Sequence, residues 1–282
     1  MDAVLLALGS ALLFGAMTVL LRPALARAPA AEAGAFLTLL SALALALAVV
    51  AARGAWRLEG LWPFLLAGVL GPGCSQLLFT LGVRDAGPSR TSLTVGTAPL
   101  FSVAIALALL GEPLVAGVLA GAVLIVAGGL LLMGERRRPA GFRARGLVFA
   151  LGATVVFASR DNLVRWLSLE TEVDPALAAA ATLAAGGATV LAWLAAMRRP
   201  VRLRDAGVFV PAGLAFGLSY VLLFEAYYRG RVTVVSPLVA TESLWGVVLS
   251  ALFLRRHERV GPRLLAGAAL VVAGGALIGA FR

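Results

Sequence analysis

The chain has 282 residues, of which 61% are hydrophobic and only 13% are charged. Soluble domains are typically about 45–50% apolar and about 25% charged, so this composition excludes a soluble enzyme, a secreted module and a disordered protein. All 24 basic residues are arginines, against 14 acidic residues, and they lie in short clusters between apolar runs. This distribution is typical of a polytopic membrane protein and argues against nucleic-acid binding.

Reactive and metal-binding motifs are missing from the sequence. The chain holds one cysteine, Cys74, and one histidine, His257. It contains no CxxC or HExxH pattern, no phosphate-binding glycine loop followed by lysine, and no lysine that could form a Schiff base. These observations predict that the protein is not an enzyme and that it holds no metal or cofactor.

Ten apolar runs are long enough for transmembrane helices. A helix needs about 20 residues to cross a hydrocarbon core about 30 Å thick. In chain order the runs cover residues 3–21, 33–52, 61–82, 88–110, 114–133, 146–167, 176–197, 206–228, 232–254 and 264–281. The connections are short, which makes consecutive helices antiparallel neighbours. We therefore predict an all-α polytopic membrane protein with ten transmembrane helices and no soluble domain.

The arginines favour one orientation of this bundle. If the N-terminus lies outside, 17 of the 24 basic residues fall in inner loops, as the positive-inside rule requires. We therefore expect both termini on the outer face. The inner arginines are Arg22, Arg27, Arg84, Arg90, Arg136, Arg137, Arg138, Arg143, Arg145, Arg198, Arg199, Arg202, Arg204, Arg255, Arg256, Arg259 and Arg263.

The two halves of the sequence end in similar segments. Residues 112–129 and 258–275 share ten identities in eighteen positions at a constant offset of 146 residues, including a glutamate at the start of each segment. Five helices per copy is an odd number, so the second copy must cross the membrane in the opposite sense. We predict a first five-helix repeat over 1–134, a basic linker over 135–145 and an inverted second repeat over 146–282. Inverted repeats underlie many secondary transporters, which bind their substrate near the membrane midplane.

Several short motifs occur at corresponding places in the two halves or within the first. They are Gly111-Glu112-Pro113 and His257-Glu258-Arg259, each with the Ala/Gly-rich span that follows, together with Phe14-Gly15 and Thr97-Ala98-Pro99-Leu100. With these motifs the two halves resemble the EamA-type transporters of the drug/metabolite transporter superfamily. The second half departs from the family pattern at residues 242–245 and 254–258. The resemblance implies a secondary carrier of the inner (plasma) membrane, commonly an exporter of amino acids and other small metabolites.

Glu242 is the clearest candidate for a transport residue, because it lies about halfway along the ninth predicted span. A charged side chain at the bilayer centre costs on the order of 2.5–3.5 kcal/mol on insertion scales. Glu242 is expected either to accept a proton or a cationic substrate, and so to couple transport, or to be a buried carboxylate hydrogen-bonded to neighbouring helices.

Two other predicted spans contain both acidic and basic residues. Asp161 and Arg165 are four residues apart and are expected to pair along one helix face. This would leave Arg160 without a partner in its own helix and available for a substrate carboxylate. Glu225 and Arg229 have the same spacing and are expected to form a pair on the helix surface.

Other candidates for substrate binding are uncharged. Tyr220 and Phe224 recur at helical spacing with Tyr227 and could stack on a solute, although Tyr227 and Tyr228 also fit an aromatic belt at the membrane interface. Further candidates for substrate binding are Gln76, Thr97 and Trp245. Gly213/Gly217 and similar glycine pairs are expected to serve helix packing, and Gly71-Pro72-Gly73 is a candidate hinge in an interrupted helix.

The sequence therefore predicts a carrier of small metabolites, embedded in the lipid bilayer, that works by alternating access, with Glu242 as the candidate for proton coupling. Two alternatives remain open at this point: a membrane subunit that transports nothing, and a membrane-embedded enzyme.

Overall fold

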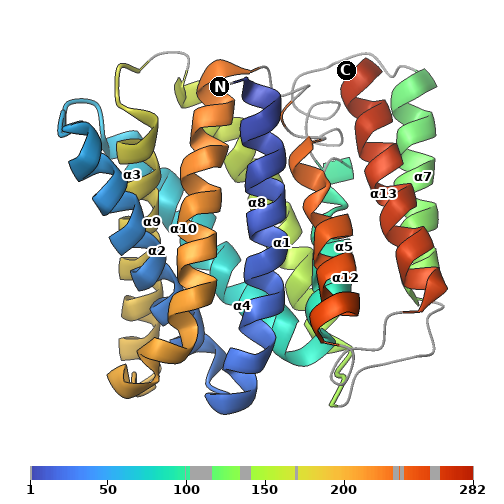
Figure 1. The fold of residues 1–282 in the computed structure, drawn as a ribbon, viewed down its shortest axis with the longest axis horizontal. Helices are drawn as coiled ribbons and strands as arrows, with labels where there is room; N and C mark the ends of the chain where they lie inside the picture. Colours follow the sequence, from blue (N-terminus) through green and yellow to red (C-terminus); the bar gives the residue numbers. More distant parts are fainter. Residues whose placement is uncertain are drawn as a thin grey trace.

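The computed structural model describes residues 2–98, 100–101, 116–133, 141–168, 171–230, 235, 238–254 and 261–281. Within these ranges the chain is helical and contains no strand. The helices stand side by side as a bundle, with both chain ends at the same end of the bundle (Figure 1). The all-α prediction is confirmed for the described residues.

Six helical segments are long and apolar enough to cross a membrane. They are α1 (Ala3–Arg27), α2 (Ala31–Arg53), the continuous segment of α3 (Trp62–Gly68), η1 (Val69–Cys74) and α4 (Ser75–Ala86), α8 (Arg145–Ser168), α9 (Pro175–Ala196), and α10 (Ala206–Arg229) with the short η2 (Leu203–Asp205) before it.

The remaining described helices are α5 (Pro88–Val95), α7 (Ala116–Met133), α12 (Glu242–Phe253) and α13 (Pro262–Phe281). The predicted spans over 88–110 and 232–254 extend into residues outside the described ranges, so the count of ten spans stays a prediction. The repeated glutamates Glu112 and Glu258 also lie outside those ranges.

Local sequence explains where several helices begin and end. Asp2 caps α1 by accepting a hydrogen bond from the backbone N–H of Val4. Asp174 caps α9 in the same way, with Pro175 at the first helical position, where its missing N–H costs nothing. Gly54 ends α2 in the left-handed conformation, with φ of 64°, which glycine adopts without strain.

The Gly71-Pro72-Gly73 stretch does not interrupt its helix. Residues Val69–Cys74 form a π turn between α3 and α4, and the helix continues through it. A π turn has wider hydrogen-bond spacing than an α-helix and accommodates the missing N–H of Pro72. The helix is therefore distorted at Pro72 but not broken, and the role of this segment as a hinge stays a prediction.

Ion pairs at one end of the bundle join the two halves of the chain. Arg57, in the loop after α2, places Nη1 2.5 Å from Oε2 of Glu172, in the link between α8 and α9. Arg53, the last residue of α2, pairs with Asp174 at the start of α9 and with Glu225 near the end of α10. We call this the Arg57 end of the bundle.

A second set of contacts marks the opposite end. Asp85, near the end of α4, lies 2.6 Å from Arg145, the first residue of α8, measured between Oδ2 and Nε. Arg22, near the end of α1, donates hydrogen bonds to the backbone carbonyls of Val83 and Arg84. We call this the Asp85 end.

These contacts fix the directions of the first helices in each half. The helix α1 ends at the Asp85 end, where α8 begins, and α2 ends at the Arg57 end, where α9 begins. Equivalent helices of the two halves therefore run in opposite directions.

The helix contacts of one half have counterparts in the other. Helix α1 packs against α10 and α12, while α8 packs against α4 and α5. Likewise α2 packs against α10, and α9 packs against α3 and η1. The pairs α2–α9, α5–α12 and α7–α13 join equivalent helices directly, the last at one edge of the bundle (Figure 1).

Glycines permit the closest of these contacts. A Cβ added at Gly213 would lie 2.4 Å from Cβ of Ser41 on α2, and one added at Gly68 would lie 2.4 Å from the carbonyl oxygen of Thr182 on α9. Neither position has room for a side chain, because these backbones touch. The packing role predicted for the α10 glycines is confirmed.

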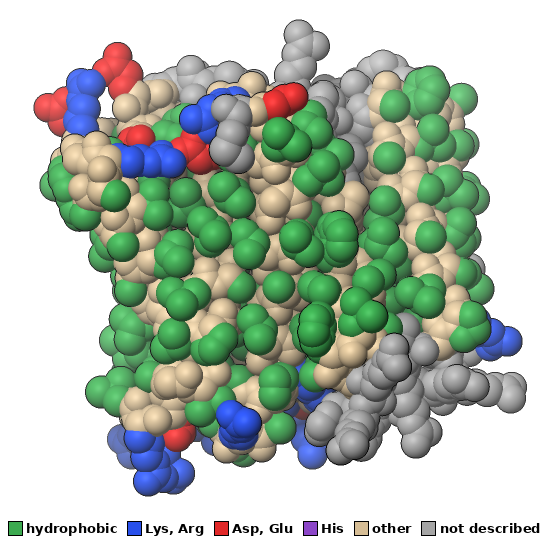
Figure 2. Space-filling model, viewed as in Figure 1, with side chains coloured by type: hydrophobic (Ala, Val, Ile, Leu, Met, Phe, Trp, Pro, Cys, Tyr) green, Lys and Arg blue, Asp and Glu red, His purple; other side chains and the backbone are tan. Residues whose placement is uncertain are grey.

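The outer surface of the bundle is apolar between its two ends. Figure 2 shows hydrophobic side chains over the middle of the visible face, with charged side chains gathered at the ends. Large exposed side chains in the middle of helices, such as Leu12, Val155 and Leu218, would face water in a soluble protein. In a bilayer they contact acyl chains instead, so this surface is that of a protein embedded in the membrane.

Candidate functional site

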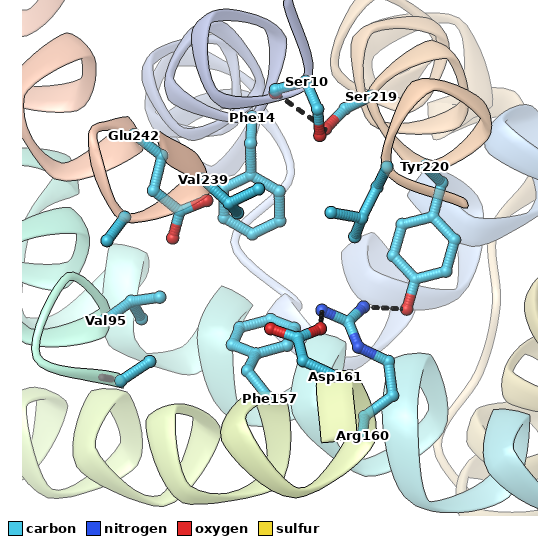
Figure 3. Close-up of a pocket in the computed structure, with 13 residues that line it drawn as sticks. Ser10, Phe14, Val95, Phe157, Arg160, Asp161, Ser219, Tyr220, Val239 and Glu242 are labelled. Carbon is cyan, nitrogen blue, oxygen red and sulfur yellow. Dashed lines mark hydrogen bonds and ion pairs between the residues drawn. The ribbon is translucent and has the colours of Figure 1, made fainter. Parts of the chain in front are cut away.

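A small cavity lies at the junction of the two halves (Figure 3). It contains about 480 Å³ of empty space, including the part that opens to solvent, yet its interior has room for only about two water molecules. The first half contributes α1 and the end of α5, and the second half contributes α8, α10 and α12. The lining residues are Ser10, Phe14, Val95, Ala98, Phe157, Arg160, Asp161, Ser219, Tyr220, Leu223, Val239, Ala240 and Glu242.

Arg160 is a buried cation with several neighbours. One terminal guanidinium nitrogen lies 2.6 Å from Oδ1 of Asp161, and the other donates a hydrogen bond to the hydroxyl oxygen of Tyr220. The guanidinium carbon also lies 5.1 Å from the ring centroid of Phe157 and 5.0 Å from that of Tyr220, within cation–π range. The prediction that Arg160 has no partner in its own helix is therefore wrong.

The backbone of the first half supports the stem of this arginine. A Cβ added at Gly71, in the π turn, would lie 2.9 Å from Cγ of Arg160. Glycine at this position lets η1 pack directly on the methylene groups of the side chain. The π turn and the buried cation are therefore in direct contact.

Glu242 is the first residue of α12, and its side chain is buried at the cavity wall with 6% of its surface exposed. Figure 3 shows its carboxylate across the cavity from Asp161 and Arg160. No described residue forms a hydrogen bond or an ion pair with this carboxylate. The positive end of the α12 dipole stabilises a carboxylate at this position. The carboxylate oxygens of Glu242 remain able to accept hydrogen bonds from a bound solute.

The rest of the cavity wall is aromatic or carries hydroxyl groups. The ring of Phe14 makes edge contacts with Phe79, Phe157 and Phe216, with centroids 5.1, 5.7 and 5.8 Å apart. The Ser219 hydroxyl donates to the backbone carbonyl of Ser10 at 2.9 Å, which ties α10 to α1 beside the cavity. The walls thus offer an apolar surface for a solute and a few hydroxyl groups.

The structure brings together three of the predicted site residues: Arg160, Tyr220 and Glu242 all line the cavity. Phe224 packs behind Tyr220, with ring centroids 5.6 Å apart, and does not line it. Gln76 is buried with its amide nitrogen 3.8 Å from the sulfur of Met17.

The other two predicted residues also lie outside the cavity lining. The Thr97 hydroxyl donates to the backbone carbonyl of Thr94 at 2.6 Å. Trp245 packs against α1: a Cβ added at Gly15 would lie 2.7 Å from the Cβ of Trp245. A role in transport for these two residues stays a prediction.

Two expectations about exposed side chains are corrected. Tyr227 is fully buried, so it does not belong to an interfacial aromatic belt. Glu225 does pair with Arg229, as its spacing predicted, but its side chain is buried and also pairs with Arg53. The Glu225 carboxylate therefore joins α10 to α2 and does not lie on an exposed helix surface. The expected partner of Asp161, Arg165, has a side chain outside the described set.

Sequence reasoning missed several cavity residues. Ser10, Phe157 and Ser219 belong to residue types that are common throughout the chain, and no local pattern marks them. Phe14 had a usable signal, because it belongs to the Phe14-Gly15 motif of the family resemblance. Among the described residues, no three His, Cys, Asp or Glu side chains come together as metal ligands.

Comparison with known proteins agrees with this architecture. The model of the EamA-like transporter family matches residues 1–134 and again residues 144–280. The chain belongs to the EamA-like transporter family. The family resemblance predicted from the sequence is thus confirmed, and with it a membrane-embedded transporter of the drug/metabolite type rather than an enzyme.

A solved structure shares the fold of this EamA-like chain. It is described only as "Crystal structure of protein" and aligns with a TM-score of 0.67 at 22% identity, covering 98% of this chain and 94% of the other. No curated protein matches the chain.

Proposed function

We propose that this protein is a secondary active transporter that carries small metabolites, such as amino acids or related solutes, outward across the inner (plasma) membrane. The observation that carries the proposal is the cavity between the halves, which is lined by three charged side chains, Arg160, Asp161 and Glu242. Buried ionisable groups inside a membrane are costly and usually serve the transported solute or ion.

Alternating access fits the directions of the helices. Equivalent helices of the two halves run in opposite directions and meet around the cavity. In such an arrangement, rocking one half against the other closes the cavity at one end and opens it at the other. We extend this to ten spans in two inverted five-helix repeats, with the first repeat over 1–134 and the second over 146–282.

The charges favour placing both termini outside. One hollow at the Asp85 end is lined by six arginines and only two acidic residues, and both chain termini lie at the opposite end. The positive-inside rule then places the Asp85 end in the cytoplasm. An impermeant protease should remove a C-terminal tag from intact cells; protection of the tag would reverse the orientation. The arginines of this hollow are Arg27, Arg84, Arg145, Arg199, Arg202 and Arg204.

Transport is tested by reconstitution into liposomes with a panel of labelled amino acids and small amines. We expect protein-dependent uptake of at least one solute, driven by an outward-directed gradient of the same unlabelled solute. Equal flux in liposomes with and without protein would favour a subunit that transports nothing. We also propose that Glu242 carries the coupling proton, so Glu242→Gln should make the remaining transport independent of pH.

Alternation itself is tested with cysteines on α1 in a Cys74→Ser background. Leu6 lies one turn from Ser10 toward the Arg57 end, and Thr18 lies one turn from Phe14 toward the Asp85 end. When the transported solute is added, labelling of Leu6→Cys and Thr18→Cys by an impermeant maleimide should change in opposite directions. Parallel changes at the two positions would argue against alternating access.

A further inference from the structure

The charges around the cavity do not balance. Arg160 and Asp161 form a contact ion pair, which leaves the carboxylate of Glu242 as an extra acidic group. This carboxylate faces the cavity, is buried at 6% exposure, and has no hydrogen-bond or ion-pair partner among the described residues. Among the described residues, the cavity therefore holds two carboxyl groups and one guanidinium, with Asp161 across from Glu242.

The arginine is already engaged by other groups. Each of its terminal nitrogens has a partner, Asp161 for one and the hydroxyl of Tyr220 for the other. The rings of Phe157 and Tyr220 lie within cation–π distance of its guanidinium. Only Nε lacks a partner among the described residues, and it is buried. A carboxylate entering the cavity would have to share Arg160 with Asp161 and would lie near the carboxylates of Asp161 and Glu242.

The cavity is better suited to a cationic solute. An ammonium group that contacts Glu242 would supply the missing hydrogen-bond donors to a desolvated carboxylate, an interaction stronger than the same contact in water. The rings of Phe14, Phe157 and Tyr220 offer their faces and edges to an apolar body. The cavity has little free room, so a solute must be small and must enter as the halves move apart.

We infer that the central cavity recognises a small protonated organic amine without a carboxylate, with its ammonium group on Glu242 and its apolar body against Phe14, Phe157 and Tyr220. This inference rests on the proposed transport function and narrows its substrate class to amines related to amino acids, rather than amino acids themselves.

Four probes of similar size separate the possible charges. They are phenethylamine, a cation; phenylalanine, a zwitterion; 3-phenylpropionate, an anion; and 2-phenylethanol, which is neutral. Binding is measured by calorimetry to the full-length protein in lipid nanodiscs. We expect phenethylamine to bind at least about tenfold more tightly than each of the other three, a difference that one desolvated charge contact readily supplies.

Variants then assign the effect to Glu242. Glu242→Gln should weaken phenethylamine binding by about tenfold or more, and Glu242→Asp should retain part of the affinity. The matched control is Glu172→Gln, because Glu172 is an exposed acidic residue at the Arg57 end; it should leave the affinity unchanged. Size-exclusion chromatography and thermal unfolding show whether each variant is folded, and Glu242→Asp keeps the test informative if Glu242→Gln fails to fold.

The results separate this inference from the proposed transport. Tighter binding of phenylalanine or phenylpropionate, no binding of any probe, or unchanged phenethylamine affinity in folded Glu242→Gln would overturn the amine assignment. If phenylalanine is carried into liposomes by both the native protein and Glu242→Gln, transport stands and the amine assignment falls. If phenethylamine binds through Glu242 but no solute crosses the membrane, the assignment stands and the transport proposal falls.

Discussion

The two halves of this protein match in architecture but differ in chemistry. Their first helices run in opposite directions and make equivalent contacts, yet the charged residues of the cavity all come from the second half. An offset of 143 residues, which matches Phe14 with Phe157 and Arg22 with Arg165, pairs Arg160 with Met17 and Asp161 with Thr18. An offset of 144 residues, which matches Thr97 with Thr241 and Leu100 with Leu244, pairs Glu242 with Ala98. At these three positions the first half has an uncharged side chain where the second half has a charge.

Glycines of the first half allow α12 to pack closely. A Cβ added at Gly15 would lie 2.7 Å from Cβ of Trp245, and one added at Gly96 would lie 2.4 Å from Cβ of Ser243. Both positions are filled by the backbone and side chains of α12. The first half thus holds α12 in place, while the second half carries the charges into the cavity. A duplicated scaffold can keep its packing symmetric and still become specialised on one side.

The largest effect is expected from removing the buried cation. Arg160→Met leaves Asp161 and Glu242 as two buried carboxylates without a compensating charge, and breaking a buried ion pair typically costs about 3–5 kcal/mol. The free energy of unfolding in mixed micelles measures this loss. The double variant Arg160→Met/Asp161→Leu should recover most of the stability but not transport. A fully stable Arg160→Met would show that the pair is not buried as described.

Hydropathy made the helices predictable from the sequence. The sequence locates α2 and α10 to within two residues, because an apolar run of that length has few alternatives to a membrane helix. Glu242 and Arg160 were found for the same reason, since charges within such runs are rare and costly.

The pairing of Arg160 was not predictable by the same rules. Helical spacing favours partners four residues apart, which pointed from Asp161 to Arg165. The structure instead shows a pair between adjacent residues, because the long arginine side chain bends back toward its neighbour while Tyr220 holds its other nitrogen. Contacts with another helix decide this choice, and local spacing carries no information about them.

A smaller loss of stability is expected at Gly96, where α5 of the first half packs closely against α12. Gly96→Ala brings its Cβ against Ser243, and overpacking of this kind typically costs about 1–3 kcal/mol. Gly187→Ala is the matched control, because no atom outside its own helix turn lies within 4 Å of the added Cβ. This control should be neutral or stabilising by up to about 1 kcal/mol. Equal unfolding free energies for the two variants would remove the packing explanation for Gly96.

The smallest effect is expected at the Arg57 end. The Arg53 side chain is 40% exposed, and its partner Glu225 keeps a second partner in Arg229. Arg53→Gln should therefore cost only about 0.2–1 kcal/mol. The loss should shrink further in high salt, because exposed charges are screened. A loss as large as that of Arg160→Met would mean that this end of the bundle, and not the cavity, holds the decisive buried charge.

The contact between Gly71 and the stem of Arg160 has a consequence for motion. A π turn can convert to an α turn by shifting one residue, which rotates the rest of the helix about its axis. Because η1 rests directly on the stem of Arg160, we expect such a rotation to shift the arginine side chain as well. The winding of a helix that contributes no side chain to the cavity would then change the position of a cation that lines it.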